Sequence, residues 1–470
     1  MQSIIYILPE LFISISVMTF LMIGVFVKKS FKLVNLLTVL SLILALILVL
    51  NQSTIPAKIF NNSYIIDDFS IFMKALTLLF SIFILICSKD YIKSTNIDKI
   101  EYPIIILSST LGMLLMISSY DLIIFYLGLE LQSLCLYILA SFRRSDEKST
   151  ESGIKYFILS ALASGLLLYG CSLVYGFTAS TNFEIISDNL NSNNTGALFG
   201  TVFIITALAF KVSAVPFHMW TPDVYEGSPT SVTSFFALIP KIAALTVFIR
   251  FMYVPFINVI DQWQIIIIFL SIGSMIFGAV AAIGQYNIKR LMAYSSIGHI
   301  GYALAGIATG TIAGVQSTII YLTIYLVMNL GAFGCIFMMK RENTFYENIN
   351  DLSGLSKNHP IFAFGFLIIL FSLAGIPPLA GFFAKFYVFM AVIESKMYSL
   401  AIIGLVTTVI SAFYYLRIIK IIYFDRPKKP FDKIYDMGLK VSLILSSILV
   451  LIYFVYPSIL TNAVSSIKIY

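Results

Sequence analysis

The stretch that decides the fold reads Lys211-Val-Ser-Ala-Val-Pro216-Phe-His218-Met-Trp220-Thr-Pro222-Asp-Val-Tyr-Glu226-Gly227. Its two prolines interrupt an apolar block over 197–236, and proline removes a backbone donor and clashes with the preceding helical turn. A second block, over 360–393, contains Gly375-Ile-Pro377-Pro378-Leu-Ala-Gly381 and then Lys385. We expect each block to be a helix broken in two, with the opened backbone facing protein or a water-filled cavity.

The rest of the chain is a series of apolar blocks. Hydrophobic residues make up 59% of the 470 positions and charged residues only 11%, about half the charge of a soluble domain. Most blocks are about 17 to 25 residues long, which suits a helix that crosses a hydrocarbon core of about 30 Å. The sequence therefore predicts an all-α, polytopic membrane protein with about fourteen helices, over 4–26, 33–50, 69–88, 103–119, 121–141, 153–177, 197–236, 238–255, 263–284, 291–309, 315–339, 360–393, 399–424 and 441–462.

The basic residues alternate between the two predicted sides of the membrane. With the N-terminus outside, the inner loops hold twenty lysines and arginines, and the outer segments hold three, Lys58, Lys396 and Lys468. This asymmetry predicts an even number of spans with both termini outside. The first 27 residues lack a basic start and a cleavage site, so we expect a first span there and no cleaved signal. The net charge of +7 then reflects topology, and no nucleic-acid partner is expected.

Four charged residues lie deep within predicted spans: Glu130, Lys211, Lys241 and Lys385. An ionised side chain at mid-bilayer costs about 2.5–3.5 kcal/mol even on a lenient insertion scale, so these residues are candidates for function. Burial disfavours the charged form of both residue types and so brings proton exchange within reach. A glutamate paired with one lysine and followed by further lysines predicts a proton relay. The alternative is a set of interhelical ion pairs that fix packing.

Other ionisable residues have two possible interpretations. Four basic residues nearer the span ends are expected to extend to the headgroup region: Lys74, Lys155, Arg250 and Arg417. His218 lies inside the first break, and His299 lies between the two breaks. Each histidine is either a proton carrier that links the charged residues or a packed core residue.

The two breaks lie 161 residues apart (377 − 216), with several spans before and after each. Discontinuous helices at matching places in two halves of a chain are typical of an inverted repeat around a transport path. Nucleotide-binding and metal-binding motifs are missing, and the four cysteines are scattered singly through apolar blocks. We therefore expect this chain to bind no cofactor.

Four segments resemble the subunit N (subunit 2) family of proton-pumping NADH:quinone oxidoreductase, respiratory complex I. They are residues 211–230, 121–133, 289–299 and 373–385, and the likeness extends over nearly the whole chain. The resemblance implies two inverted five-helix repeats with broken seventh and twelfth helices. Within a single membrane domain, 1–470, it implies helices 1–3 over 1–100, a first repeat over 101–255, a second over 256–430 and a last helix over 431–470.

The same resemblance implies a function and partners. Glu130, Lys211, Lys241 and Lys385 would form the central polar axis of a proton channel. NADH, flavin, iron–sulfur clusters and quinone would be bound by other subunits, and the partners would be neighbouring antiporter-like and small membrane subunits in the lipid bilayer. The expected location is the inner membrane of a bacterium, or else the mitochondrial inner membrane of a protist. The alternatives are a subunit of a multisubunit cation/proton antiporter, which shares these features, and a structural scaffold, which needs no buried lysine.

Substitution of Glu130 tests the relay interpretation. We expect Glu130→Ala to reduce proton pumping coupled to quinone reduction while the complex still assembles, because a mid-span carboxylate with no basic neighbour on its own helix suits proton transfer. The measurement is proton uptake by vesicles during quinone reduction. Normal pumping at a normal rate would leave Glu130 only a packing role.

Overall fold

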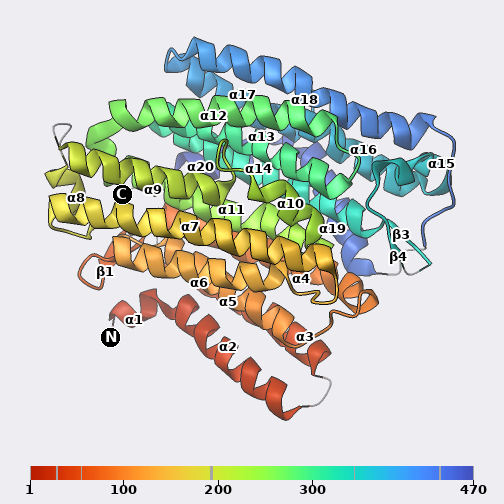
Figure 1. Cartoon of the computed structure of the whole chain (residues 1–470), viewed down its shortest axis with the longest axis horizontal. Helices are drawn as coiled ribbons and strands as arrows, with labels where there is room; N and C mark the ends of the chain where they lie inside the picture. Colours follow the sequence, from red (N-terminus) through yellow and green to blue (C-terminus); the bar gives the residue numbers. More distant parts are fainter. Residues whose placement is uncertain are drawn as a thin grey trace.

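The computed structural model describes residues 2–27, 30–53, 55–190, 194–342, 344–432 and 436–468. Within these ranges, twelve helices are long and apolar enough to cross a membrane, and Glu101–Ile117 and Pro360–Ala374 are shorter apolar helices. The helices run roughly side by side along the long axis of the molecule (Figure 1). The all-α, multi-pass architecture is confirmed, and the count of fourteen spans stays a prediction.

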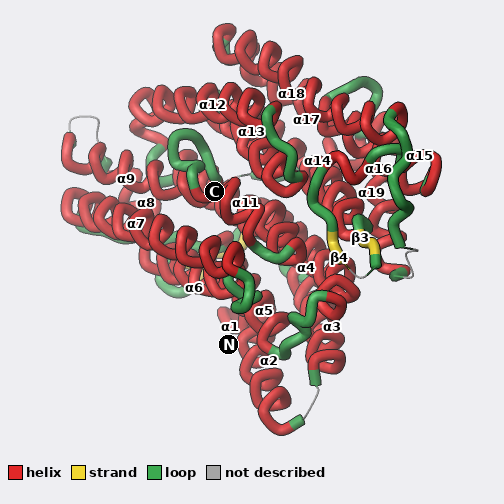
Figure 2. The backbone as a smooth tube through the Cα atoms, turned by 45° about the vertical axis from the view of Figure 1, so that its right-hand side comes forward, coloured by secondary structure: helices red, strands yellow, loops and turns green. Residues whose placement is uncertain are grey.

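Connections of very different lengths join the helices, as the tube in Figure 2 shows. In chain order the α-helices are α1 Gln2–Tyr6, α2 Leu8–Phe26, α3 Phe31–Leu50, α4 Asp68–Ser94, α5 Glu101–Ile117, α6 Leu122–Ala140, α7 Glu147–Thr178, α8 Phe183–Asn189, α9 Thr195–Val212, α10 Trp220–Gly227, α11 Thr230–Tyr253, α12 Ile260–Ile283, α13 Ile288–Ala308, α14 Ile312–Phe337, α15 Leu355–Asn358, α16 Pro360–Ala374, α17 Ala380–Glu394, α18 Tyr398–Phe424, α19 Met437–Val455 and α20 Ser458–Ser465. Two short 3₁₀ helices cover Ile257–Val259 and Ile349–Leu352.

Two small antiparallel hairpins lie outside the bundle. The first pairs β1 (Ala57–Ile59) with β2 (Tyr64–Ile66), and the second pairs β3 (Lys340–Arg341) with β4 (Thr344–Phe345). In Figure 1, β1 and the marks for both chain ends lie toward the left-hand end of the helices, and β3 and β4 lie at the right-hand end. The two hairpins therefore mark opposite ends of the bundle.

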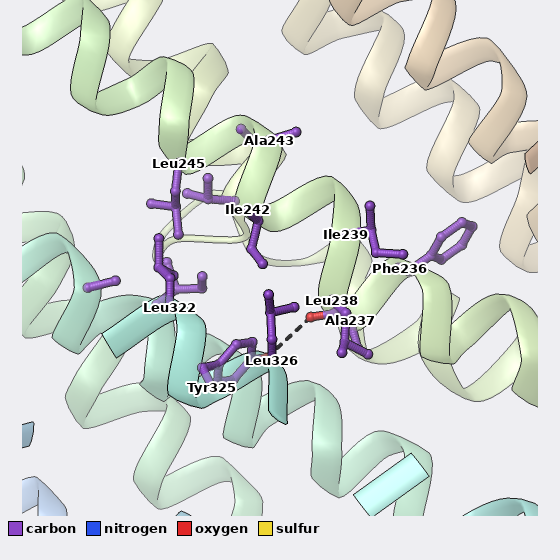
Figure 3. Packing of buried hydrophobic residues seen from close by; sticks show 14 of the residues in the cluster. Phe236, Ala237, Leu238, Ile239, Ile242, Ala243, Leu245, Leu322, Tyr325 and Leu326 are labelled. Atoms are coloured by element: carbon purple, nitrogen blue, oxygen red, sulfur yellow. Dashed lines mark hydrogen bonds between the residues drawn. The ribbon is translucent and has the colours of Figure 1, made fainter. Parts of the chain in front are cut away.

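Helices α11, α13 and α14 form the centre of the bundle. The most apolar stretch of α11 is 100% buried inside the protein, and those of α13 and α14 are 94% and 89% buried, against 28% for α2. Figure 3 shows side chains of α11 packed beside Leu322 and Leu326 of α14, where Tyr325 donates a hydrogen bond of 3.3 Å to the Ala237 carbonyl. A charge in the middle of α11 therefore has only protein groups around it.

Both proline-containing segments are interrupted. Residues 213–219 separate α9 from α10, and residues 375–379 separate α16 from α17. Each first half is followed by a residue in the left-handed conformation, Ser213 with φ +66° and Gly375 with φ +85°. A left-handed residue turns the chain out of the helix and ends the run of helical hydrogen bonds. The prolines that follow then keep the helix from resuming.

The boundaries after the first break differ from the predicted ones. The sequence predicts apolar helix up to residue 236 and a new span over 238–255, but α10 ends at Gly227 and α11 already begins at Thr230. Pro240 therefore lies inside α11. Proline frees the carbonyl four residues earlier, here that of Phe236, and is tolerated inside a buried membrane helix when neighbouring groups adjust. Tyr325 of α14 donates to the adjacent Ala237 carbonyl. As a result, Lys241 lies mid-helix rather than at the start of a span.

The turns that precede α6 and α13 are built in the same way. Residues 120–122 exchange two backbone hydrogen bonds with residues 181–183, and residues 286–288 exchange two with residues 347–349. The first pair lies beside the β1–β2 hairpin through the bridge between Tyr64 and Ser119, and the second follows β4. One local construction thus occurs twice, at opposite ends of the bundle.

Two of the four basic residues that were expected to reach the headgroups are fully buried. Lys74, 0% exposed, donates to Glu10 over 2.6 Å, and Arg250, 1% exposed, donates two hydrogen bonds of 3.0 and 2.9 Å to Asp67. The expectation is wrong for these two because each finds a carboxylate within the bundle. Burying either cation without that partner would cost several kcal/mol.

The other two end-of-span cations do reach the surface of the chain. The Lys155 side chain is 41% exposed, and Arg417 is half-buried. Among the inner-loop residues that predict the orientation, Lys28, Lys29 and Lys433 lie outside the described residues.

Removal of one buried carboxylate should destabilise the fold. Asp67→Ala leaves the Arg250 guanidinium buried without its two-point carboxylate contact, so we expect a loss of about 3–5 kcal/mol of stability. The measurement is the unfolding midpoint of the protein in detergent. The matched control is Asp425→Ala, which breaks the Lys420–Asp425 pair, where the lysine is 67% exposed, and should cost about 0–1 kcal/mol. Equal shifts for the two variants would contradict a structural role for the buried pair.

Candidate functional site

Lys211 lies at the end of α9, next to the first break, and is 7% exposed. Its ammonium donates to two hydroxyls on neighbouring helices, Ser133 Oγ on α6 at 2.8 Å and Ser160 Oγ on α7 at 2.7 Å. Hydroxyl oxygens can accept from an ammonium and donate onward, so both can pass a proton.

Glu130 lies one helical turn before Ser133 on α6 and is half-buried. In the described part of the chain, its buried Oε1 has no hydrogen-bond partner. Its charge attracts the Lys211 ammonium, but the two residues form no ion pair. Glu130 and Lys211 therefore interact electrostatically without direct contact, and the glutamate–lysine relay stays a prediction.

Lys241, 1% exposed, lies in the middle of α11. It donates a short hydrogen bond to Ser296 Oγ on α13, and its Nζ lies 5.3 Å from the centroid of the Tyr225 ring on α10. A cation over an aromatic face is stabilised by the ring's negative π surface. These two groups stabilise the ammonium in place of water.

Lys385 lies in α17, just after the second break, and is 5% exposed. Its Nζ donates to the carbonyls of Leu373 at 3.3 Å and Ala374 at 3.1 Å, the last residues of α16, and lies 5.1 Å from the Tyr302 ring centroid. Carbonyls at a helix C-terminus lack partners within the helix and carry a partial negative charge. The break thus supplies acceptors that a continuous helix would have used internally.

His299 lies between the last two lysines and is 4% exposed. Its two ring nitrogens contact the hydroxyls of Tyr321 at 2.5 Å and Tyr415 at 3.2 Å. Both Lys241 and Lys385 are near enough to interact electrostatically with the ring. A cavity of about 10 Å³, lined by His299 and Lys385 among others, has room for about one water molecule.

His218 does not join this group. It is half-buried in the first break, with its ring centroid 4.4 Å from that of Phe277 on α12. Its Nδ1 has no hydrogen-bond partner among the described residues, and no hydrogen bond or ring contact of this histidine reaches the four charged residues there. The structure therefore brings together His299, Lys241 and Lys385 at one end of the site, and Glu130 and Lys211 at the other.

Sequence reasoning missed the groups that contact the charges: Ser133, Ser160, Tyr225, Ser296, Tyr302, Tyr321 and Tyr415. One local signal was present, because Ser133 follows Glu130 by three residues and Ser296 precedes His299 by three, which places each pair on one helix face. Tyr302 follows His299 by three residues on α13 and carries the same signal, whereas Tyr225, Tyr321 and Tyr415 come from other helices and carry none.

The three lysines differ from Lys74 and Arg250 in lacking a direct ion pair within the described chain. In the ranges that the structure describes, no salt bridge of 4.0 Å or less joins Lys211, Lys241 or Lys385 to a carboxylate, although Lys74 and Arg250 have such partners. The described residues also contain no group of three or more histidines, cysteines or carboxylates that could hold a metal ion. Amines, hydroxyls and an imidazole in this arrangement suit proton exchange.

Comparisons with known proteins find relatives over the whole length of the chain. The family model described as NADH:quinone oxidoreductase/Mrp antiporter, TM, matches residues 119–411. NADH-quinone oxidoreductase subunit N of Pelagibacter ubique is 62% identical over 470 residues, with 100% of both chains covered. The protein of that name from Rhodospirillum rubrum is 52% identical over 97% of this chain and 95% of its own.

Solved structures share the fold. A chain of respiratory complex I from Thermus thermophilus is 29% identical, with a TM-score of 0.85 over 98% of this chain and 100% of its own. A chain of the Mrp complex from a Dietzia species has a TM-score of 0.83 over 97% of this chain and 95% of its own, but at 20% identity it shows only the fold.

The second break offers a test that needs no knowledge of activity. In Gly375→Ala, the new Cβ would lie 3.1 Å from Cδ and Nζ of Lys385, at a backbone φ of +85° that favours glycine. We expect a loss of about 1–2 kcal/mol of stability from the strained backbone, together with displacement of the Lys385 ammonium. Thermal unfolding measures the first effect and a structure of the variant measures the second. Gly284→Ala is the control, since nothing lies within 4 Å of its added Cβ, and equal stability of the two variants would argue against the strain.

Proposed function

The chain belongs to the NADH-quinone oxidoreductase subunit N family, and from this premise we propose that it is a proton-translocating membrane subunit of that enzyme. One observation carries the mechanism: three buried lysines have no carboxylate within salt-bridge distance in the described chain, and hydroxyls or carbonyls contact each of them. A buried amine that keeps no fixed counter-charge gains by releasing its proton. The three are therefore suited to change protonation state.

The proposed relay has two sections. In the first, Glu130 attracts the Lys211 ammonium, and Ser133 and Ser160 hold it. In the second, Lys241 and Lys385 each interact electrostatically with His299, with Ser296 and the tyrosine hydroxyls as donors and acceptors.

The two sections meet at α10 and α11. Tyr225 of α10 lies beside Lys241, and its buried hydroxyl has no partner in the part of the chain described. Trp220 lies five residues earlier on α10 and stacks on Tyr156 of α7, with 4.4 Å between the ring centroids. Tyr156 lies one helical turn before Ser160. Proton movement between Lys211 and Lys241 would pass this aromatic layer with the help of water at the free Tyr225 hydroxyl.

Electron transfer from NADH to quinone would occur in other subunits of the complex. Flavin, iron–sulfur clusters and the quinone site belong to those subunits, and this chain would contribute the coupled proton path. Its partners would be the other membrane subunits, both antiporter-like and small ones. The relatives compared above are bacterial, which supports a bacterial inner membrane as the location.

The proposed organisation is one membrane domain with helices 1–3 over 1–100, repeats over 101–255 and 256–430, and a last helix over 431–470. The turn construction that occurs twice at opposite ends of the bundle supports an inverted repeat, as do the left-handed residues Ser213 and Gly375 at the two breaks. The chain ends lie at the end of the bundle opposite β3, which carries Lys340 and Arg341 (Figure 1). This supports both termini outside.

The two alternatives explain less. A cation/proton antiporter subunit shares the fold, but the 62% identity over the full length is to subunit N of the oxidoreductase. A scaffold would have no use for lysines that are buried and unpaired, since apolar residues of similar volume would pack at lower cost.

Lys241→Arg separates a shuttling lysine from a fixed positive charge. Arginine stays protonated in proteins, so it serves as a fixed charge but cannot release a proton. We expect the variant to lose most pumping, nearly as much as Lys241→Ala. The measurement is the number of protons translocated per electron by vesicles that contain the assembled complex.

The control is assembly, because arginine is bulkier than lysine and Lys241 is 1% exposed. A loss of pumping counts only if the variant complex contains all its subunits and still reduces quinone. If the assembled Lys241→Arg complex pumps like the parent, Lys241 acts as a fixed positive charge and does not transfer protons.

A further inference from the structure

Six charged side chains gather where α7, α10 and α13 meet, around a cavity of about 160 Å³. We name this group the three-helix charge cluster; its members are Lys148, Glu151, Lys155, Asp223, Glu226 and Arg290. Three are positive and three are negative, so the cluster is neutral as a unit. None of the six belongs to the relay.

Arg290 is the hub of the cluster. Its Nη1 lies 2.8 Å from Asp223 Oδ1 and 3.1 Å from Glu226 Oε2, so one guanidinium holds both carboxylates of α10. The second oxygens are held from α7, by Lys155 on Asp223 at 2.9 Å and Lys148 on Glu226 at 3.2 Å. Ion pairs thus join the short helix α10 to α13 on one side and to α7 on the other.

Two further contacts hold the end of α10 in the same place. Lys289, beside Arg290 on α13, donates over 3.0 Å to the carbonyl of Ser228, the residue that follows α10. On the other side, a Cβ on Gly227 would lie 2.4 Å from the Lys148 carbonyl, so only glycine permits α10 to approach α7 this closely. Gly227 and Ser228, which directly follow Glu226, are therefore also held in place.

The elements that Arg290 joins are the same two that stabilise Lys241. On α10, Tyr225 lies between Asp223 and Glu226 in sequence, and its ring faces the Lys241 ammonium. On α13, Ser296 follows Arg290 by six residues, about 9 Å along the helix, and accepts the Lys241 hydrogen bond. Lys241 of α11 therefore contacts one group on α10 and one on α13, so a change in the separation of α10 and α13 would alter at least one of these contacts.

We propose that Arg290 is a positioning residue that locks α10 to α13 and so holds Tyr225 and Ser296 on Lys241. This inference rests on the proposed relay. Asp223, Glu226 and Arg290 are 35%, 24% and 31% exposed, so a single pair among them would add little stability. As a network across three helices, they fix a geometry, and a displacement of 1 Å at a reacting group can lower its rate by about 100-fold.

The experiment compares Arg290→Gln, Arg290→Lys and Lys420→Gln in the assembled complex in vesicles. Glutamine removes the charge, lysine keeps it, and Lys420→Gln breaks an exposed pair with Asp425 elsewhere on the chain. We expect Arg290→Gln to assemble, to reduce quinone and to lower proton transfer by about tenfold or more. Arg290→Lys should restore most of the transfer, and Lys420→Gln should match the parent.

The second readout is a structure of the Arg290→Gln complex. We expect Tyr225 or Ser296 to have moved away from Lys241, and an unchanged pair of contacts would overturn the proposal. If Arg290→Gln fails to assemble, Glu226→Gln replaces it, since that variant leaves Asp223 on Arg290 and should give a smaller loss in the same direction. Normal transfer in Arg290→Gln, or in Glu226→Gln where Arg290→Gln does not assemble, alongside loss in Lys241→Ala, would reject the positioning role and leave the relay standing. Normal transfer in Lys241→Ala would reject the relay itself.

Discussion

The structure depends on how an ammonium group is stabilised where no bulk water reaches it. Lys211, Lys241 and Lys385 are each at most 7% exposed, and each needs hydrogen-bond acceptors to offset the cost of burial. The chain supplies hydroxyls for the first two and backbone carbonyls of α16 for the third. The carbonyls of a continuous helix accept hydrogen bonds from the helix itself. The break after α16 therefore leaves two backbone carbonyls free to accept from Lys385.

The choice of partners separates two kinds of buried charge in this chain. Lys74 and Arg250 bond carboxylates, and these pairs fix packing: the first joins α4 to α2, and the second joins α11 to the start of α4. The three relay lysines bond neutral groups, so loss of a proton leaves no buried carboxylate unpaired. Chemistry and stability are thus assigned to different residues, although all of them are buried cations on adjoining helices.

Much of this arrangement could be predicted from local patterns. The spans follow from block length, and the breaks follow from Pro216 and Pro377, because proline acts on its own helix. Contacts between distant segments could not be predicted in the same way. The sequence does not show that Lys74 meets Glu10, that Ser133 accepts a hydrogen bond from Lys211, or that Pro240 is accommodated within α11, since each depends on which helix packs beside which.

The most direct test of the account is the number of protons translocated per electron by the complex carrying His299→Gln, reconstituted in vesicles. Glutamine keeps hydrogen-bonding groups near Tyr321 and Tyr415 but cannot take up and release a proton as imidazole does. A continuous relay through Lys241, His299 and Lys385 predicts a fall in this ratio with quinone reduction retained. The parent ratio in a fully assembled variant would contradict it.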